Sequence, residues 1–361
     1  MDKLRVGFIG AGRISDLHAI EYLKNERAEL VAVCDTDLKT AQSRAAAWGV
    51  PENRVFTNYQ DLLALKEVDL VEILTPHHLH RQHTLDAAAA GKHVSLQKPM
   101  ALNVAQANEM IAATKKAGVI FKVFENFIFY PPVVRAKELI DAGEIGEPLT
   151  IRIKSNAANS PNAWPIPRSA QTWRFDMSKS GGGPLVFDDG HHKFSLAWFF
   201  MGGAAEEVHA WIGSLEAPLG GEVGLIDSPA IVSWKFPRNR FGSLEVVYSP
   251  EMIVDTNHYA QDDRIEITGT KGVIWITRGH GHMMDVPPVI MYKDRKTYTY
   301  SDMPVGWEHS FINSTRHFID AYFKGEPPSL TGEQGRDILQ FALAAQESAR
   351  SGQSVRVVPV A

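Results

Sequence analysis

Residues 4–15 of the chain read Leu4-Arg5-Val6-Gly7-Phe8-Ile9-Gly10-Ala11-Gly12-Arg13-Ile14-Ser15. The short apolar run predicts a strand, and a helical pattern begins after the glycines. The glycines fit the pattern G-x-G-x-x-G, with Ser15 in the third place. This pattern is weak by itself, because an ordinary strand–turn–helix can also contain it.

An acidic residue about 20 positions after the glycines strengthens this interpretation. A second predicted strand, Leu30 to Cys34, leads directly into Asp35. In dinucleotide-binding folds an acidic residue here binds the ribose hydroxyls. Gly10 would permit the tight turn, and Gly12 would let the backbone approach a pyrophosphate at the helix N-terminus. We therefore predict a dinucleotide-binding domain.

The residues around Asp35 favour NAD over NADP as the cofactor. A carboxylate at this position would bond a ribose 2′-hydroxyl and repel a 2′-phosphate. Thr36 and Asp37 follow it, with no adjacent arginine to receive a phosphate. Arg13 or Lys39 folding back toward the ribose would change this preference.

Strand and helix patterns alternate regularly as far as Phe124. Apolar strand runs end at Leu74, Leu96 and Phe124, and helices are expected over 38–48, 79–90 and 103–116. Apolar strands separated by helices predict a parallel sheet covered on both faces. We assign residues 1–124 to an N-terminal Rossmann domain with a doubly wound parallel sheet.

Lys98 ends another apolar run, Val94-Ser95-Leu96-Gln97-Lys98-Pro99. The residue before a proline is pushed toward extended geometry. Lys98 should therefore lie at the carboxyl end of a strand, where open α/β sheets bind ligands. Taken alone, the stretch also fits a surface lysine in a turn.

Four histidines follow the strand that ends at Leu74, namely His77, His78, His80 and His83. They suggest a metal site, but no cysteine or carboxylate lies beside them at ligand spacing. We predict no metal here, and we expect Thr75-Pro76 to pass close to a nicotinamide.

From Pro148 onward the pattern changes to a series of strands. They are expected over 149–155, 207–212, 231–236, 241–248, 264–268, 273–277, 289–293 and 297–301. Late helices are expected over 307–323 and from a capping box at Thr331 to about Arg350. Residues 125–361 are therefore predicted to form an α+β domain with a large, mostly antiparallel (mixed) sheet.

A triple glycine, Gly181 to Gly183, precedes a segment that contains both acidic residues and histidines. If a helix begins near Pro184, Asp188 and His192 are four residues apart on one face. A carboxylate beside an imidazole raises its basicity and fixes its tautomer, which suits proton transfer at a hydroxyl or carbonyl. Asp189 and Lys193 have the same spacing and could be a plain surface pair, while His191 would point toward solvent or core.

The segment from Asn156 to Arg174 is rich in amide and indole side chains. Amides bond hydroxyls and indole faces cover C–H surfaces, so the segment suits a polyhydroxylated ligand. Arginines would also accept a carboxylate or phosphate. The alternative is an ordered loop that packs on its own domain or on a neighbouring subunit. The candidate substrate contacts are Asn156, Trp164, Arg168, Trp173 and Arg174.

Composition excludes several other kinds of protein. The net charge is −5, with no long run of like charges, which argues against nucleic acid or an anionic membrane as the main partner. Cys34 is the only cysteine, so no internal disulfide can form. There is no signal-peptide pattern and no apolar stretch of membrane-spanning length. We expect a soluble cytoplasmic protein.

Over essentially its whole length the sequence resembles the Gfo/Idh/MocA oxidoreductases, the family of glucose-fructose oxidoreductase and inositol dehydrogenase. The resemblance rests on motifs that are specific only in combination. They are Val6-Gly7-Phe8-Ile9-Gly10-Ala11-Gly12, Thr75-Pro76 with His80, Ala90-Gly91-Lys92-His93-Val94 with Lys98-Pro99, Asn126 with Phe129-Tyr130-Pro131, Ile267 to Gly272, and Ser348 to Gly352.

The resemblance implies a Rossmann domain followed by an α/β domain whose open sheet serves in oligomerisation, as a homodimer or homotetramer. The family motif is Glu-Lys-Pro; here Lys98 matches the lysine, and Gln97 replaces the glutamate. The family's Asp-x-Gly-x-His segment maps onto Asp188, Gly190 and His192, with one extra residue after Gly183. In the family this aspartate and histidine position the substrate and move the proton.

The resemblance implies NAD(P)-dependent, reversible oxidation of a secondary alcohol on a sugar, cyclitol or related polyol. We expect His192 to act as general base, Lys98 to bond the reacting oxygen, and Asp188 to orient His192 or bind a neighbouring hydroxyl; Lys98 and His192 could exchange roles. Alternatives within the family are redox-neutral cleavage of a glycoside by transient oxidation and a non-catalytic dinucleotide sensor. The expected cofactor contacts are Gly10, Gly12, Arg13, Ile14, Asp35, Thr75, Pro76, His77, His80, Gln97, Lys98 and Asn126.

Overall fold

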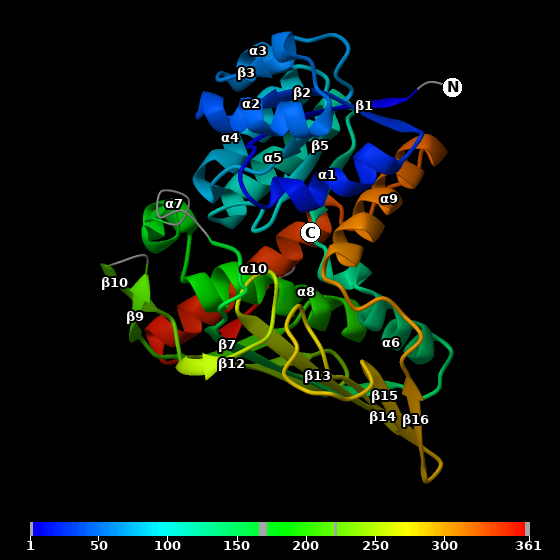
Figure 1. The fold of residues 1–361 in the computed structure, drawn as a ribbon. Coiled ribbons are helices and arrows are strands. Elements are labelled where there is room, and N and C mark those ends of the chain that lie inside the picture. Colours follow the sequence, from blue (N-terminus) through cyan, green and yellow to red (C-terminus); the bar gives the residue numbers. More distant parts are fainter. Residues whose placement is uncertain (1–2, 166–171, 220–221, 358–361) are drawn as a thin grey trace. The chain divides into compact units, whose positions relative to one another are not determined.

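The computed structural model describes residues 3–165, 172–219 and 222–357 (Figure 1). The chain forms two compact units, each of which is built from three separate stretches of the sequence. The first unit consists of residues 1–126, 178–181 and 311–339, and the second of residues 127–177, 182–310 and 340–361. Each unit is described below by itself.

The first unit is built on a six-stranded parallel sheet with the order β3-β2-β1-β4-β5-β6. This is the strand order of a doubly wound dinucleotide-binding fold, so the predicted fold class is confirmed for this part of the chain. All its neighbouring strands pair in parallel. The strands are β1 (Leu4–Ile9), β2 (Ala28–Cys34), β3 (Val55–Phe56), β4 (Leu70–Ile73), β5 (His93–Gln97) and β6 (Phe121–Phe124).

Helices connect these strands, and several of them begin at a residue whose side chain caps the helix. Asp37 caps the second helix by accepting a hydrogen bond from the backbone N–H of Thr40, and Gly49 ends that helix with a φ of 72°. Asn103 caps a later helix in the same way, as the sequence predicts. The helices are α1 (Ser15–Lys24), α2 (Leu38–Trp48), α3 (Tyr59–Leu63), α4 (His77–Ala89) and α5 (Val104–Ala117), with a 3-10 turn η1 (Glu52–Arg54).

A segment from late in the sequence completes the first unit. Most of α9 (Glu308–Lys324) and the start of α10 (Gly332–Ser351) belong to it. Phe318 and Ile319 of α9 are buried in the same apolar cluster as Leu4 and Val6 of β1. The backbone N–H of Val123 in β6 also donates to the carbonyl of Leu330.

The second unit contains a nine-stranded sheet with the order β16-β15-β14-β13-β7-β12-β11-β8-β17. Strands β7 and β12 pair in parallel, and the other neighbouring pairs are antiparallel, which confirms the predicted mixed sheet. The strands are β7 (Pro148–Asn159), β8 (Glu207–Ile212), β11 (Ala230–Phe236), β12 (Arg240–Ile253), β13 (Gln261–Gly269), β14 (Gly272–Ile276), β15 (Val289–Lys293), β16 (Lys296–Tyr300) and β17 (Val355–Arg356).

Two details of the second unit differ from the sequence prediction. A separate antiparallel hairpin, β9 (Leu215–Leu219) and β10 (Glu222–Ile226), was not predicted. Its strands contain glycine, proline and glutamate, which are depleted in strands and therefore give a poor local signal. The expected helix from Pro184 begins as a π-helix, η5 (Pro184–Asp189), before α8 (Gly190–Met201).

Helices cover one face of the nine-stranded sheet, and α8 and the end of α10 lie along it (Figure 1). Phe341 of α10 packs with its ring centroid 4.6 Å from Phe194 of α8 and 5.0 Å from Trp234 of β11. The other helical segments are α6 (Pro131–Asp141) and α7 (Met177–Ser180), with 3-10 turns η2 (Phe127–Phe129) and η4 (Thr172–Phe175). Among the described residues, no helix is both long and apolar enough to cross a membrane.

Candidate active site

The glycine turn after β1 has the geometry that a bound dinucleotide needs. Gly10 has a φ of 95°, and a Cβ there would lie 2.9 Å from the carbonyl carbon and oxygen of Leu74. Only glycine tolerates both conditions. A Cβ on Gly12 would meet no atom within 4 Å. The backbone at Gly12 therefore borders open space, where a pyrophosphate could approach the N-terminus of α1.

Asp35 is held against this turn by two backbone hydrogen bonds. Its Oδ2 accepts from the N–H of Ala11 at 2.8 Å, and its Oδ1 accepts from the N–H of Asp37 at 3.0 Å. An ionised carboxylate has about four lone-pair sites, so it can still accept from ribose hydroxyls. Ser15 is fully buried and donates from Oγ to the carbonyl of Gly12 at 2.6 Å, so a small side chain suffices in the third glycine position.

Two histidines of α4 hold the loop at the end of β4. The ring nitrogens of His80 lie 2.8 Å from the carbonyl oxygen of Thr75 and 2.9 Å from that of Pro99. His80 thus connects the loop after β4 to the one after β5. Nδ1 of His83 lies 3.1 Å from Oγ1 of Thr75, and burial lowers the pKa of His83 to about 4.

His77 of this helix has a backbone neighbour as well. Nδ1 of His77 lies 2.8 Å from the carbonyl oxygen of Ser180, a residue of the same unit. Helix α4 begins at His77 rather than at Leu79, with Pro76 immediately before it. Within the described ranges there is no group of three or more His, Cys, Asp or Glu that could hold a metal ion.

Lys98 lies directly after Gln97, the last residue of β5, and is half-buried. The predicted position at the carboxyl end of a strand is therefore confirmed, and its peptide bond to Pro99 is cis. Thr75 and Asn126 follow the ends of the neighbouring strands β4 and β6, and Asn126 is buried. These side chains share one edge of the sheet, where doubly wound folds bind ligands.

Sequence reasoning missed three fully buried polar residues near this edge, namely His18, Glu72 and Lys122. Nε2 of His18 lies 3.0 Å from Nε2 of Gln97. Lys122 donates to the carbonyl and hydroxyl oxygens of Ser314 at 2.7 and 2.8 Å. Glu72 and Lys122 each sit inside an otherwise apolar strand, and that pattern was a usable signal, because charged residues are almost never fully buried without partners.

In the second unit, the glycines before Pro184 allow close packing. A Cβ on Gly183 would lie 2.2 Å from Oδ2 of Asp227. The Asp227 carboxylate accepts hydrogen bonds from the backbone N–H groups of Leu185 and Val186 at 2.8 and 2.7 Å, so it caps η5. Burial raises the pKa of Asp227 to about 6.

Asp188 lies in η5 and is 8% exposed. Its Oδ2 accepts a hydrogen bond from Nε of Arg174 at 3.1 Å. Arg174 also lies over the ring of Trp173, 4.5 Å from its centroid. Arg174, a predicted substrate contact, therefore lies next to Asp188, and Trp173, another one, lies against Arg174. Arg168 lies outside the described residues.

The alternative of a plain surface pair between Asp189 and Lys193 is wrong. Lys193 is fully buried, and its Nζ lies 2.8 Å from Oδ2 of Asp189 and 3.1 Å from Oδ2 of Asp263. Nε2 of Gln261 donates to the same Asp189 oxygen at 2.7 Å. Burial lowers the pKa of Lys193, but the two carboxylates raise it by more, so the net pKa lies above the usual lysine value.

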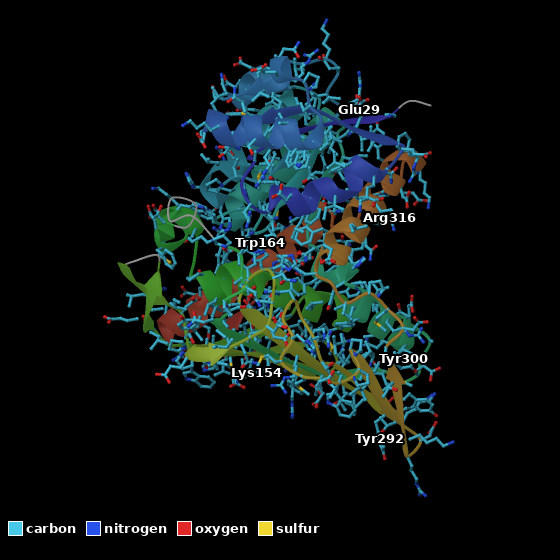
Figure 2. All side chains as sticks on the ribbon, viewed as in Figure 1. Glu29, Lys154, Trp164, Tyr292, Tyr300 and Arg316 are labelled. Carbon is cyan, nitrogen blue, oxygen red and sulfur yellow. The ribbon has the colours of Figure 1, made fainter. Side chains whose placement is uncertain are left out.

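His192 and Trp164 border one aromatic cluster in the second unit. The His192 ring lies 4.7 Å from the ring of Phe127, and His192 is 7% exposed. Trp164, labelled in Figure 2, is half-buried and packs 4.8 Å from His258 and 6.4 Å from Trp307. The cluster presents aromatic faces of the kind that cover the C–H surface of a sugar.

The other predicted residues of this unit lie deeper. His191 is buried and packs edge-on against Phe187, so it points into the core. Asn156 is 9% exposed and lies in β7, paired in register with Asp262 of β13 and Val247 of β12. Asn156 therefore lies within a strand, opposite a carboxylate residue, and not in a loop.

Comparison with known proteins matches both units. Residues 4–125 match the GFO_IDH_MocA model, described as "Oxidoreductase family, NAD-binding Rossmann fold", and residues 137–357 match its partner, described as "Oxidoreductase family, C-terminal alpha/beta domain". The chain is 29% identical to myo-inositol 2-dehydrogenase of Thermotoga maritima over 99% of both chains.

Two further proteins extend the comparison. The chain is 25% identical to scyllo-inositol 2-dehydrogenase (NAD(+)) of Bacillus subtilis, over 98% of this chain and 96% of that protein. The crystal structure of a probable dehydrogenase from Thermotoga maritima superimposes with a TM-score of 0.77 at 27% identity, covering 98% of this chain and 99% of the other.

Proposed function

The chain belongs to the GFO_IDH_MocA oxidoreductase family, and we propose that it reversibly oxidises a secondary alcohol of a sugar, cyclitol or related polyol. The observation that carries this proposal is the full-length similarity to two inositol 2-dehydrogenases, together with Lys98, Asp188 and His192. The enzyme is an NAD-dependent oxidoreductase that acts on CH–OH groups. Redox-neutral glycoside cleavage is not needed to explain any feature of the described residues.

The first unit fits NAD. Gly10 permits the tight turn, Gly12 leaves the backbone open to a pyrophosphate, and Asp35 offers carboxylate oxygens to the ribose. Arg13, Ile14, Thr75, Pro76, His77, His80, Gln97, Lys98 and Asn126 are the further proposed contacts. When bound, the nicotinamide takes up or returns the hydride.

The chain's own residues must move the hydroxyl proton and orient the carbinol. We assign the proton to Nε2 or Nδ1 of His192 as general base in the oxidation direction. Lys98 would donate a hydrogen bond to the reacting oxygen and stabilise the negative charge that develops on it. Asp188 would orient His192 or bind a neighbouring hydroxyl. Exchange of the roles of Lys98 and His192 is the alternative.

The substrate contacts proposed in the second unit suit a polyol. Trp164 and Trp173 would cover C–H faces, and Asn156 would bond a hydroxyl. Arg174 contacts Asp188 directly, so its proposed effect is on the site carboxylate as well as on the substrate.

A substrate screen that follows NADH absorbance tests this function. Inositols, aldoses and other polyols are offered with NAD and with NADP in parallel. We expect turnover on at least one polyol, faster with NAD, and none in Lys98→Ala, which should still bind NAD. Full activity in Lys98→Ala, or turnover of non-polyol alcohols alone, would contradict the assignment.

We also propose self-association through the open face of the nine-stranded sheet, as a homodimer or homotetramer. This face carries exposed apolar side chains on adjacent strands, since Trp211 is 62%, Ile231 42% and Phe241 49% exposed. Trp211 and Ile231 are direct cross-strand neighbours. Lys154 and Tyr292, labelled in Figure 2, lie on strands of the same sheet. Sedimentation of the wild type and of Trp211→Glu tests this, with dissociation expected in the variant.

A cytoplasmic location stays a prediction.

A further inference from the structure

A line of buried polar side chains leads from Lys98 into the first unit. Gln97 accepts a hydrogen bond on Oε1 from the backbone N–H of Lys98 at 2.8 Å. Its Nε2 lies 3.0 Å from Nε2 of His18 in α1. Nδ1 of His18 and Oε2 of Glu72 in β4 lie 3.3 Å apart, which is an ion-pair distance, but within the described residues neither atom makes a hydrogen bond. Oε1 of Glu72 accepts from the hydroxyl of Tyr22 at 2.8 Å.

The direction of the contacts in this line is set at Lys98. A backbone N–H can only donate, so Gln97 must turn its oxygen toward Lys98 and its nitrogen toward His18. An amide nitrogen also can only donate, so Nε2 of His18 accepts. A neutral His18 ring then carries its proton on Nδ1, which faces Glu72. The donor of Gln97 therefore faces His18, and Nδ1 of His18 faces the Glu72 carboxylate at ion-pair distance.

Beyond the half-buried Gln97, the surroundings shield this line from water and fix the orientation of its central ring. His18 and Glu72 are both fully buried. The His18 ring packs 4.0 Å from the ring of Phe124 and 5.2 Å from that of Phe311. In such a low-dielectric interior, the attraction between the N–H of a histidine ring and a carboxylate 3.3 Å away is stronger than it would be in water.

Two other titratable groups face Glu72. Tyr22 stays a donor, because burial and the neighbouring carboxylate raise its pKa well above the usual tyrosine value. Lys122 of β6 is fully buried; burial lowers its pKa to about 7, and the charge of Glu72 opposes that shift. Glu72 therefore accepts directly from Tyr22 and acts on Lys122 through its charge.

We propose that Glu72, acting through His18 and Gln97, is a positioning residue that holds the backbone of Lys98 for the reaction. The inference rests on the proposed function of Lys98. It also explains why an amide stands at position 97, since the line needs a donor toward His18 there.

Substituting Gln97 changes the protonation of His18 in a defined way. In Gln97→Glu, an oxygen would face the lone pair of Nε2, so His18 would take a second proton between two carboxylates. In the double variant Glu72→Gln/Gln97→Glu, the carboxylate moves to the other end of the line. His18 would then be neutral again, with its proton on Nε2.

The state of His18 can be read by nitrogen-15 NMR on the full-length protein labelled at histidine, without any substrate. The chain has 14 histidines, so the resonances of His18 are assigned from their loss in His18→Gln. We expect protonated Nδ1 and bare Nε2 in the wild type at pH 7, both nitrogens protonated in Gln97→Glu, and the reversed tautomer in the double variant. A wild-type His18 with a proton on Nε2 would overturn the inference.

Turnover supplies the second readout. Glu72→Gln and Gln97→Glu should each lower kcat by about tenfold, a loss typical of one coupled polar contact. In Glu72→Gln, which leaves every proposed NAD contact in place, the KM for NAD should change little. The double variant should recover to within about threefold of the wild type, because one carboxylate and one amide are again present. Losses that multiply in the double variant would show that these residues act independently and would overturn the inference.

A matched control is Tyr22→Phe, which removes one hydrogen bond to Glu72 but leaves the line itself intact. It should keep the wild-type tautomer of His18; a changed tautomer would contradict the assigned direction. Lys98→Ala separates the two hypotheses. Activity in Lys98→Ala would overturn the proposed function of Lys98 and the positioning role that rests on it, whereas an inactive Lys98→Ala with multiplying losses in the double variant would overturn only the positioning role.

Discussion

The guanidinium of Arg174 donates a hydrogen bond from Nε to Oδ2 of Asp188 over 3.1 Å. Asp188 is almost entirely buried, while the Arg174 side chain is 35% exposed. The carboxylate that was expected to serve His192 therefore has a cationic partner of its own. Arg174 should matter to turnover through the charge and position of Asp188, whether or not it also touches the substrate.

We predict that Arg174→Ala lowers kcat/KM for the polyol by about tenfold or more, since a hydrogen bond between charged groups contributes about 1.5–3 kcal/mol. Arg174→Lys should retain part of the activity, because the charge remains but the guanidinium geometry is lost. Steady-state kinetics at fixed NAD measure both. The matched control is Arg135→Ala, which removes an exposed pair with Glu138. Equal kcat/KM in Arg174→Ala and wild type would contradict the prediction.

Asp35 should govern the choice between NAD and NADP. Asp35→Asn keeps the side-chain shape but removes the charge that repels a 2′-phosphate. We expect a higher KM for NAD and a smaller preference for NAD over NADP, seen as a lower ratio of the two kcat/KM values.

The control for this change is Asp37→Asn, two residues away. Asp37 caps α2 and is exposed, so an amide there keeps the cap while removing one negative charge from the same loop. If Asp37→Asn alters the cofactor ratio as much as Asp35→Asn does, the preference comes from the general field of the loop and not from a contact to the ribose.

Local patterns predicted the two sheets because each strand and helix carries its own signal. The turn at Gly10 and the end of β5 before Lys98 follow from neighbouring residues alone. The sequence could not assign α9 to the first unit, since its apolar face would suit either sheet. That assignment depends on Phe318 and Ile319 meeting β1, a contact across some three hundred residues of chain.

The candidate site was harder to predict wherever it depends on a contact between residues that are distant in the sequence. Asp188 and His192 were paired by helical spacing, but spacing says nothing of Arg174, which reaches Asp188 from η4. Likewise, the spacing of Asp189 and Lys193 fitted a surface pair, but the fold buries Lys193 and adds a second carboxylate, that of Asp263 on β13. Periodicity shows which residues share a face, and only the tertiary fold shows what that face meets.

Lys193 should be essential for stability. Lys193→Met would leave Asp189 and Asp263 without their cation in a buried site, and breaking such a pair costs about 3–5 kcal/mol. Because the net pKa of Lys193 is raised, its contribution is fully present below the usual lysine pKa and is lost only as the pH rises above it. Urea unfolding at pH 7 measures the loss.

For comparison, Lys137→Ala removes an ion pair with Asp141 on the surface of α6, where about 0–1 kcal/mol is expected. A loss in Lys193→Met no greater than in this control would mean that water reaches the two carboxylates. The double variant Lys193→Met/Asp263→Asn should recover part of the stability, because one uncompensated charge is removed with its partner.

Lys122 should make the first unit more stable as the pH rises. Burial lowers the pKa of Lys122 to about 7, against 10.5 for an ordinary lysine. Between these values the unfolded chain binds a proton that the folded chain does not, so the free energy of unfolding increases with pH. The slope from this one group is at most about 1.4 kcal/mol per pH unit.

Urea unfolding of the wild type and of Lys122→Met from pH 7 to 10 isolates this effect, because all other groups titrate in both proteins. We expect the free energy of unfolding of the wild type, minus that of the variant, to increase as the pH rises. Lys116→Met, at an exposed position of α5, controls for the loss of one surface lysine. A difference between wild type and Lys122→Met that stays flat or shrinks would mean that Lys122 remains charged, held as an ammonium by Glu72 despite its burial.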